Sequence, residues 1–145
     1  MTPVYSPLEP VGDAVVGALL RDSMVTQLAA GGVSTSVPEN PTFQFVWVEV
    51  LHDGDEGGFG TTPGNGSAPT VTIRVHVFQG NHGTLRDCQR LAARVIAVLV
   101  DPPTVAGYDV FAIFHEATVP LADQELRGTV VTEIVAQFQL LLEEA

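Results

Sequence analysis

Two stretches of alternating apolar residues, joined by a long polar segment, constrain the fold of this chain more than any other feature. Residues 43–51 and 70–78 both have the alternation and the β-branched and aromatic residues that are typical of strands. The eighteen residues between them, 52–69, are mostly glycine, acids and small polar groups. A tight hairpin needs only two to five residues, and a structureless loop of this length is usually functional or disordered. The sequence therefore predicts a strand pair that carries an extended loop.

The order of the other elements predicts an α+β fold. We expect one domain over residues 1–145, with a mostly antiparallel sheet of four strands or slightly more and two main helices packed on one face. Helical spacing of apolar residues predicts helices over 10–21, 24–30 and 85–101, and Asp101-Pro102-Pro103 ends the last of these. Further strands are expected over 33–37, 108–116 and 128–142.

Apolar residues fall on both predicted faces of the sheet. Along residues 70–78 the odd positions are apolar and the even ones are mostly polar, so one face is expected to cover the helices. The opposite face nonetheless receives Phe43, Phe45, Trp47, Val131, Val135 and Leu141 from other strands. One interpretation is that another subunit buries this second surface. The other is that these residues face the core or pack against the long loop. The sequence leaves both interpretations open.

Composition narrows the class of protein. Nearly half of the 145 residues are apolar, which is enough for a real core. No apolar run is long enough to span a bilayer, and the N-terminus lacks the pattern of a signal peptide, so we expect a soluble protein made in a cytosol, with no membrane partner. The single cysteine, Cys88, excludes an internal disulfide and a thiolate zinc site, and its helical position predicts a buried small hydrophobic residue.

The charge of the chain argues against nucleic-acid binding. Six arginines, no lysines and seventeen acids give a formal net charge of −11. A protein that binds DNA needs a basic patch that displaces counterions from the phosphates, whereas this surface repels phosphates on average. Either DNA is irrelevant to this protein, or DNA passes close to it without binding.

No residue pattern predicts catalysis, a cofactor or a metal site. His52, Asp53, Asp55 and Glu56 form an acidic cluster, but it lacks the later bidentate acid of a calcium loop, so a solvated acidic loop is the better interpretation. The histidines have no i, i+4 partner, no serine lies in a Gly-x-Ser-x-Gly setting, and the glycines of residues 54–66 lack the lysine of a phosphate loop. We expect a protein that is not an enzyme.

Arg86, Arg90 and Arg94 are the one concentration of positive charge. Their spacing places them on one side of a helix, opposite its apolar stripe. A solvated helix face is one interpretation. The other is a contact with an acidic neighbour, such as an identical subunit, because the planar guanidinium group pairs bidentately with carboxylates.

The layout of the chain resembles that of the tail terminator (tail completion) family of long-tailed bacteriophages. The matching features are a first helix around residues 15–20, then 22–28 before Gly31-Gly32, then 37–43 leading into a strand, the alternating segment 72–78, the helix start 85–91 and two closing strands. The resemblance extends over nearly the whole chain. The loop 52–69 is longer than is expected of the shorter members.

This resemblance implies a structural virion protein that is made in the host cytoplasm and needs no catalysis. Such a protein forms a homohexameric ring that ends polymerisation of the tail tube and offers a docking surface to the head–tail connector, while DNA passes through its lumen without specific binding. The interfaces are then expected in the turn 102–107, in the loop 52–69 and on the basic helix face. The candidate contact residues are Asp53, Asp55, Glu56, Phe59, Arg86, Arg90 and Arg94.

Two alternative functions are compatible with the same residues. One is another neck component, a head–tail stopper or adaptor of similar size and fold. The other is a small non-viral α+β binding module that forms dimers and holds a small molecule in a groove. An enzyme is the weakest of these interpretations, because no nucleophile, base or cofactor signature is present.

Overall fold

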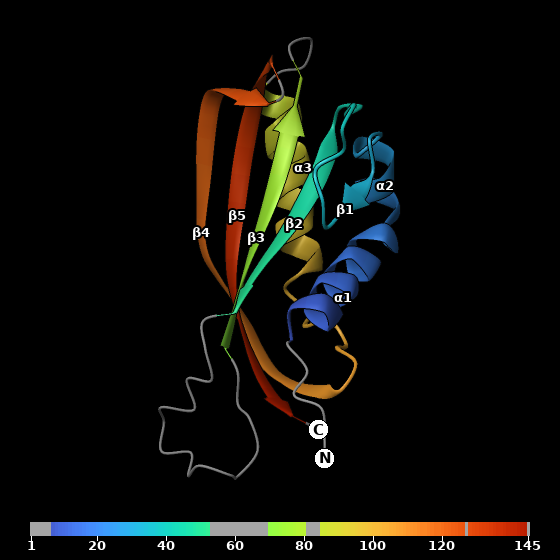
Figure 1. The fold of residues 1–145 in the computed structure, drawn as a ribbon, viewed down its shortest axis with the longest axis vertical. Helices are drawn as coiled ribbons and strands as arrows, with labels where there is room; N and C mark the ends of the chain where they lie inside the picture. Colours follow the sequence, from blue (N-terminus) through green and yellow to red (C-terminus); the bar gives the residue numbers. More distant parts are fainter. Residues whose placement is uncertain (1–6, 53–69, 81–84, 127, 145) are drawn as a thin grey trace.

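The fold is α+β, as the sequence predicts (Figure 1). The computed structural model describes residues 7–52, 70–80, 85–126 and 128–144. The helices are α1 (Leu8–Leu20), α2 (Ser23–Leu28) and α3 (Leu85–Val98). The strands are β1 (Val33–Ser34), β2 (Phe45–His52), β3 (Thr70–Gln79), β4 (Tyr108–Leu126) and β5 (Thr129–Glu144). None of the described helices combines the length and the apolar character that crossing a membrane requires.

The strands form one sheet of five in the order β1-β2-β3-β5-β4. Every neighbouring pair is antiparallel except β1 and β2, which are parallel. Five strands agree with the predicted four or slightly more, and β1 has only two residues of the strand expected over 33–37. Strand β4 is also much longer than the predicted 108–116, because it continues through Pro120 to Leu126. Proline is tolerated on an edge strand, where its missing N–H removes no bond of the sheet.

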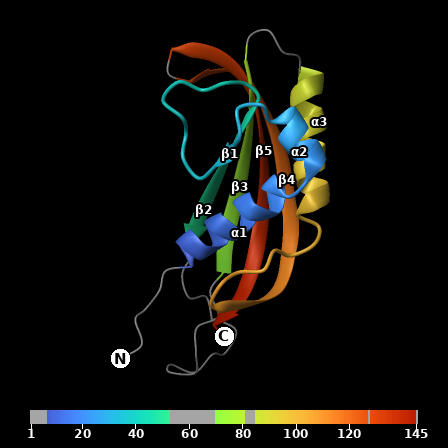
Figure 2. The same ribbon diagram turned by 90° about the vertical axis from the view of Figure 1, so that its right-hand side faces the viewer.

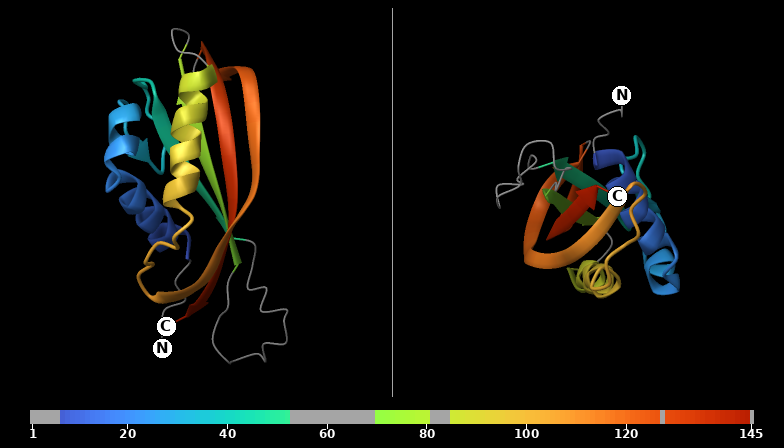
Figure 3. Two further views of the ribbon diagram at one scale, coloured as in Figure 1. Left: turned by 180° about the vertical axis from the view of Figure 1, so that it is seen from behind. Right: turned by 90° about the horizontal axis from the view of Figure 1, so that it is seen from below.

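The helices cover one face of the sheet, as Figures 2 and 3 show. The apolar odd positions of β3, Val71, Ile73, Val75 and Val77, point to this face and are fully buried in one core cluster with apolar residues of α1 and α3. Cys88, Leu91 and Val95 of α3 are inaccessible to solvent, which confirms the predicted apolar stripe at these positions, whereas Leu85 at its beginning is 46% exposed. The main core therefore lies between α1, α3 and the three central strands β2, β3 and β5.

A second, smaller apolar cluster lies on the opposite face of the sheet, which we call the open face. Phe45 and Phe78 stack there with ring centroids 4.8 Å apart, and Val131 is buried against them. The β4–β5 hairpin bends at its tip away from the side on which α3 lies, and contributes Leu126 and Val131 to this cluster (Figure 2). At this end of the open face the chain itself buries the apolar residues, so no second subunit is needed to cover them.

Short-range hydrogen bonds define the beginning of α2 and the turn that follows it. Asp22 is the N-cap, and one of its carboxylate oxygens accepts hydrogen bonds from the backbone N–H groups of Met24 and Val25. After α2 the chain turns at Gly31, whose N–H donates to the Gln44 carbonyl at 2.7 Å. A Cβ atom at position 31 would lie 1.6 Å from the Thr42 carbonyl oxygen, so this close approach of two backbone segments requires glycine.

Candidate subunit interface

Strand β4 presents a long apolar edge to solvent. It pairs with β5 on one side, and no other strand of the described residues lies on its other side. We call residues 110–121 the β4 edge. Every residue from 114 to 120 is exposed, including Phe114 at 53% and Val119 at 46%, and Phe111 is 65% exposed. A soluble single domain rarely leaves so many apolar side chains uncovered along one strand.

The exposure of this strand has a structural cause. Helix α3 packs over β3 and β5, and the residues of β4 that do reach the core, Tyr108, Val110 and Ile113, are only partly buried. Phe114 lies opposite Gln139 of β5 and Val119 opposite Val135, so both side chains belong to the open face. Irregularities in the pairing interrupt the register at three places along β4 and bend the strand.

The β4 edge carries little charge for a chain as acidic as this one. Among residues 110–121 only Glu116 is formally charged at neutral pH, and His115 is the one further titratable group. The Nε2 atom of His115 is 2.7 Å from the hydroxyl of Thr118. Natural proteins protect an exposed edge strand with charges, with proline or with a covering element. Within the described parts of the chain only Pro120 and Glu116 serve this purpose, so the edge is suited to pairing with another chain.

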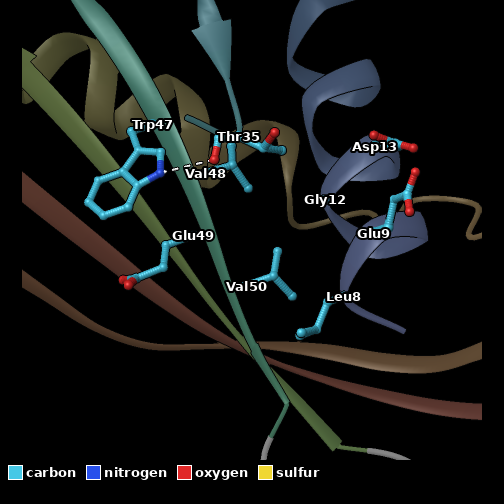
Figure 4. A pocket seen from close by; sticks show the side chains of 9 residues that line it. All are labelled: Leu8, Glu9, Gly12, Asp13, Thr35, Trp47, Val48, Glu49 and Val50. Atoms are coloured by element: carbon cyan, nitrogen blue, oxygen red, sulfur yellow. Dashed lines mark hydrogen bonds between the residues drawn. The ribbon is translucent and has the colours of Figure 1, made fainter. Parts of the chain in front are cut away.

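At the other side of the sheet, the outer edge of β2 is only partly covered. Strand β1 pairs with Val46 and Trp47 alone. Beyond this point a hollow of about 420 Å³ lies between β2 and the beginning of α1 (Figure 4). We call it the β2-edge hollow. It is lined by Leu8, Glu9, Gly12, Asp13, Thr35, Trp47, Val48, Glu49 and Val50.

The open face also holds a polar network centred on His76 of β3. Its Nδ1 atom is 2.6 Å from Oε2 of Glu133 on β5, and its Nε2 atom is 3.0 Å from Oε1 of Glu49 on β2. The ring of Trp47 stacks on the imidazole at 4.2 Å. Burial alone lowers the pKa of His76, but the hydrogen bonds and charges of Glu133 and Glu49 outweigh burial, so the pKa is raised above its ordinary value of 6.5.

Neighbouring rungs of the same face extend this network. Arg74 Nε donates to Gln137 Oε1 at 3.1 Å, and an Arg74 guanidinium nitrogen is 3.8 Å from Glu49. The hydroxyl of Thr72 donates to Gln139 Oε1 at 3.3 Å. These bonds join β2, β3 and β5 across the strands and so fix their register. Among the described residues, no group of three or more His, Cys, Asp and Glu side chains is arranged to hold a metal ion.

The spacing of the histidines, none of which has an i, i+4 partner, did not predict this network around His76. The sequence does hold one indication of it, because the alternation along the predicted strands places Glu49, His76 and Glu133 each on the polar face of its own strand. The pairing register that brings the three side chains together was not available from the sequence.

The three arginines of the predicted basic helix face lie in different environments. Arg94 forms an ion pair within the chain, with its Nη2 atom 2.6 Å from Oδ2 of Asp22 and its Nε atom 3.1 Å from both carboxylate oxygens. Hydrogen bonds from Arg94 and from the Val25 backbone lower the pKa of Asp22 to about 2. Arg86 and Arg90 are exposed on α3. Arg90 and Arg94 also line a hollow of about 580 Å³ between α2 and α3.

The other predicted contact residues are placed as follows. Asp53, Asp55, Glu56 and Phe59 lie outside the described residues, so their proposed role stays a prediction. In the predicted turn 102–107, Val105 is buried against the main core. None of the predicted contact residues belongs to the β4 edge, which sequence reasoning interpreted as a strand of ordinary length.

Comparison with known proteins gives one finding about the fold. No protein-family model matches the sequence, and no curated protein matches it. A chain in the solved virion of a native gene transfer agent particle has a similar structure, with a TM-score of 0.70 and 17% sequence identity. The similarity covers 92% of this chain and 94% of that chain. At this level of identity the two chains share a fold over almost their whole lengths.

Proposed function

We propose that this chain is a structural protein of a phage-like virion, and specifically a tail terminator. Copies of it form a homohexameric ring at the head-proximal end of the tail tube. The ring ends polymerisation of the tube and joins the tail to the head–tail connector or stopper protein. The observation that carries this proposal is the uncovered apolar β4 edge on a fold shared with a chain of a gene transfer agent virion.

The β4 edge supports assembly because an exposed apolar edge strand readily pairs with another chain. A contact between identical copies must also overcome the repulsion between chains with a net charge of −11 each. The β4 edge has little charge of its own, so it is a surface on which copies can meet with a small electrostatic penalty.

The acidic composition supports a ring through which DNA moves. Carboxylates offer no partner to phosphates, so a lumen with this average charge lets DNA pass without specific binding. The ring function requires complementary surfaces and no reacting groups. We therefore propose no catalytic residue, cofactor or metal for this protein.

The polymerisation of the matching tail tube protein tests the function directly. Tube subunits are assembled with and without this chain, and tube length is measured by electron microscopy. A terminator shortens the tubes in proportion to its concentration and is seen as a ring at one end. A stopper or adaptor joins finished tails without changing tube length, so unchanged tubes would favour that alternative. A chain that neither binds tubes nor forms rings would refute the virion proposal and favour a small binding module.

A further inference from the structure

We propose that copies of this chain join head to tail, with the β4 edge of one copy pairing with the outer edge of β2 in the next. This inference rests on the proposed ring and names the surfaces that form it. A head-to-tail contact between two different surfaces is the type that closes into a ring, whereas a contact of one surface with itself stops at a dimer. The two surfaces here lie at opposite ends of one sheet.

The directions of the strands favour this contact. Strands β2 and β5 run one way and strands β3 and β4 run the other, because each neighbouring pair is antiparallel. When copies are related by rotation about an axis roughly parallel to the strands, every strand keeps its direction. Strand β4 of one copy then meets β2 of the next in the antiparallel orientation, which continues the alternation already present within the sheet.

The outer edge of β2 is accessible over part of its length. Strand β1 occupies only the positions beside Val46 and Trp47, and no strand of the described residues pairs with 48–52 on that side. The β2-edge hollow lies along this same segment (Figure 4). A neighbouring strand therefore finds both backbone groups and a recess for its side chains at one place.

The side chains on the two edges are complementary on each face of a continued sheet. On the open face, the exposed Phe114 and Val119 of β4 come beside the uncovered segment 48–52 of the next copy, whose side chains on that face are Glu49 and Leu51. On the helical face, His115 lies opposite Phe138 and therefore points to the side on which α1 packs. The α1 residues that line the hollow there include the acids Glu9 and Asp13, beside Leu8 and Gly12. The apolar side chains of the β4 edge thus meet the segment that carries Leu51, and the imidazole of His115 lies on the same side as the two carboxylates of the hollow.

A photo-reactive residue at one edge can locate its neighbour without assuming a register. p-Benzoylphenylalanine replaces Phe114, and equal amounts of isotopically labelled and unlabelled copies are mixed, assembled and irradiated. Peptides that join a labelled to an unlabelled chain identify contacts between copies. We expect these cross-links to fall on the peptides of α1 and β2. Cross-links between copies that fall on the α2–α3 hollow, or on β4 of the other copy, would overturn the inference.

Two damaged variants test whether the contact is head to tail. Phe114→Glu places a charge on the β4 edge, and Leu8→Glu places one at the hollow, where Leu8 is 37% exposed. For each variant alone, the dissociation constant of the contact between copies should be at least ~30-fold higher than for the unmodified chain, as expected for a central interface residue. In a mixture of the two, the Leu8→Glu copy supplies an intact β4 edge and the Phe114→Glu copy supplies an intact hollow. The mixture should therefore yield heterodimers in native mass spectrometry. Val130→Glu, at a 50% exposed apolar residue of β5, is the matched control and should still form rings.

The outcomes separate this inference from the proposed function. If the unmodified chain forms rings while the two folded variants fail to form heterodimers, the inference is wrong and the ring stands. If Phe114→Glu keeps its ring, the inference is also wrong. If the unmodified chain forms no ring, either alone or with tube protein, the proposed function fails and the inference fails with it. Circular dichroism of each variant establishes that it is folded before these comparisons.

Discussion

Replacing His76 by leucine tests the energetic role of the buried polar network. The Glu133 residue is 8% exposed, and its carboxylate has the His76 imidazole 2.6 Å away as an ion-pair partner. Removing the imidazole leaves this charge buried without that partner, which costs about 3–5 kcal/mol. In a domain of this size each kcal/mol lowers the melting temperature by about 2–4 °C. We therefore expect His76→Leu to melt about 10 °C lower or more, while remaining folded at room temperature.

Two companion variants separate charge burial from packing. In Glu133→Gln the side chain keeps an acceptor for His76 but loses its charge, so the expected cost is about 1 kcal/mol. The double variant His76→Leu with Glu133→Leu replaces the pair by apolar groups and should recover most of the loss. Urea unfolding followed by far-ultraviolet circular dichroism measures all three. A cost below about 1 kcal/mol for His76→Leu alone would show that the network does not hold the strands together.

The pH dependence of the same network has a definite sign. The pKa of His76 is raised in the folded chain, so the protonated imidazole is stabilised by folding. This contribution is fully present below the ordinary value of 6.5 and is lost as the pH rises through the higher pKa of the folded state. The difference in stability between the unmodified chain and His76→Gln should therefore shrink as the pH rises above 6.5. A difference that grows over this range would contradict the assignment.

Three further predictions concern single contacts. Asp22→Asn keeps a capping side chain for α2 but weakens the pair with Arg94. Because the pKa of Asp22 is lowered to about 2, the difference in stability between this variant and the unmodified chain should be present above pH 4 and vanish as the pH falls through about 2. The Cys88 thiol is buried with its pKa raised to about 11, so a thiol reagent should label it only as the chain unfolds, and rapid labelling of the native protein would contradict its placement. Phe78→Ala should cost about 3–5 kcal/mol in urea unfolding because it removes the ring between Phe45 and Val131, and a loss below 1 kcal/mol would refute the second apolar cluster.

Local periodicity was sufficient to find the central elements. Strand β3 was predicted as 70–78 and ends one residue later, at Gln79. Its alternation is regular because one face covers the core and the other carries the polar network. Helix α3 was predicted by its apolar stripe, and the same stripe faces the core. For these elements the period of the sequence and the burial of the side chains agree.

The features that depend on pairing between distant segments were not predictable. Strand β4 loses its alternation because both of its faces are exposed over residues 114–120, and Pro120 is more typical of a strand end. The spacing of the arginines identified one helix face, but the partner of Arg94 is Asp22, 72 positions away. The register across β2, β3 and β5 places His76 between its two carboxylates, and no local pattern encodes that register.

The oligomeric state of the purified chain tests the central claim most directly. Native mass spectrometry over a range of concentrations, alone and with tail tube protein, measures the number of copies in each species. Our account predicts a closed hexameric ring with no larger open polymer, because a head-to-tail contact that closes leaves no free edge. A chain that stays monomeric at high concentration, and remains so beside tube protein, would contradict it.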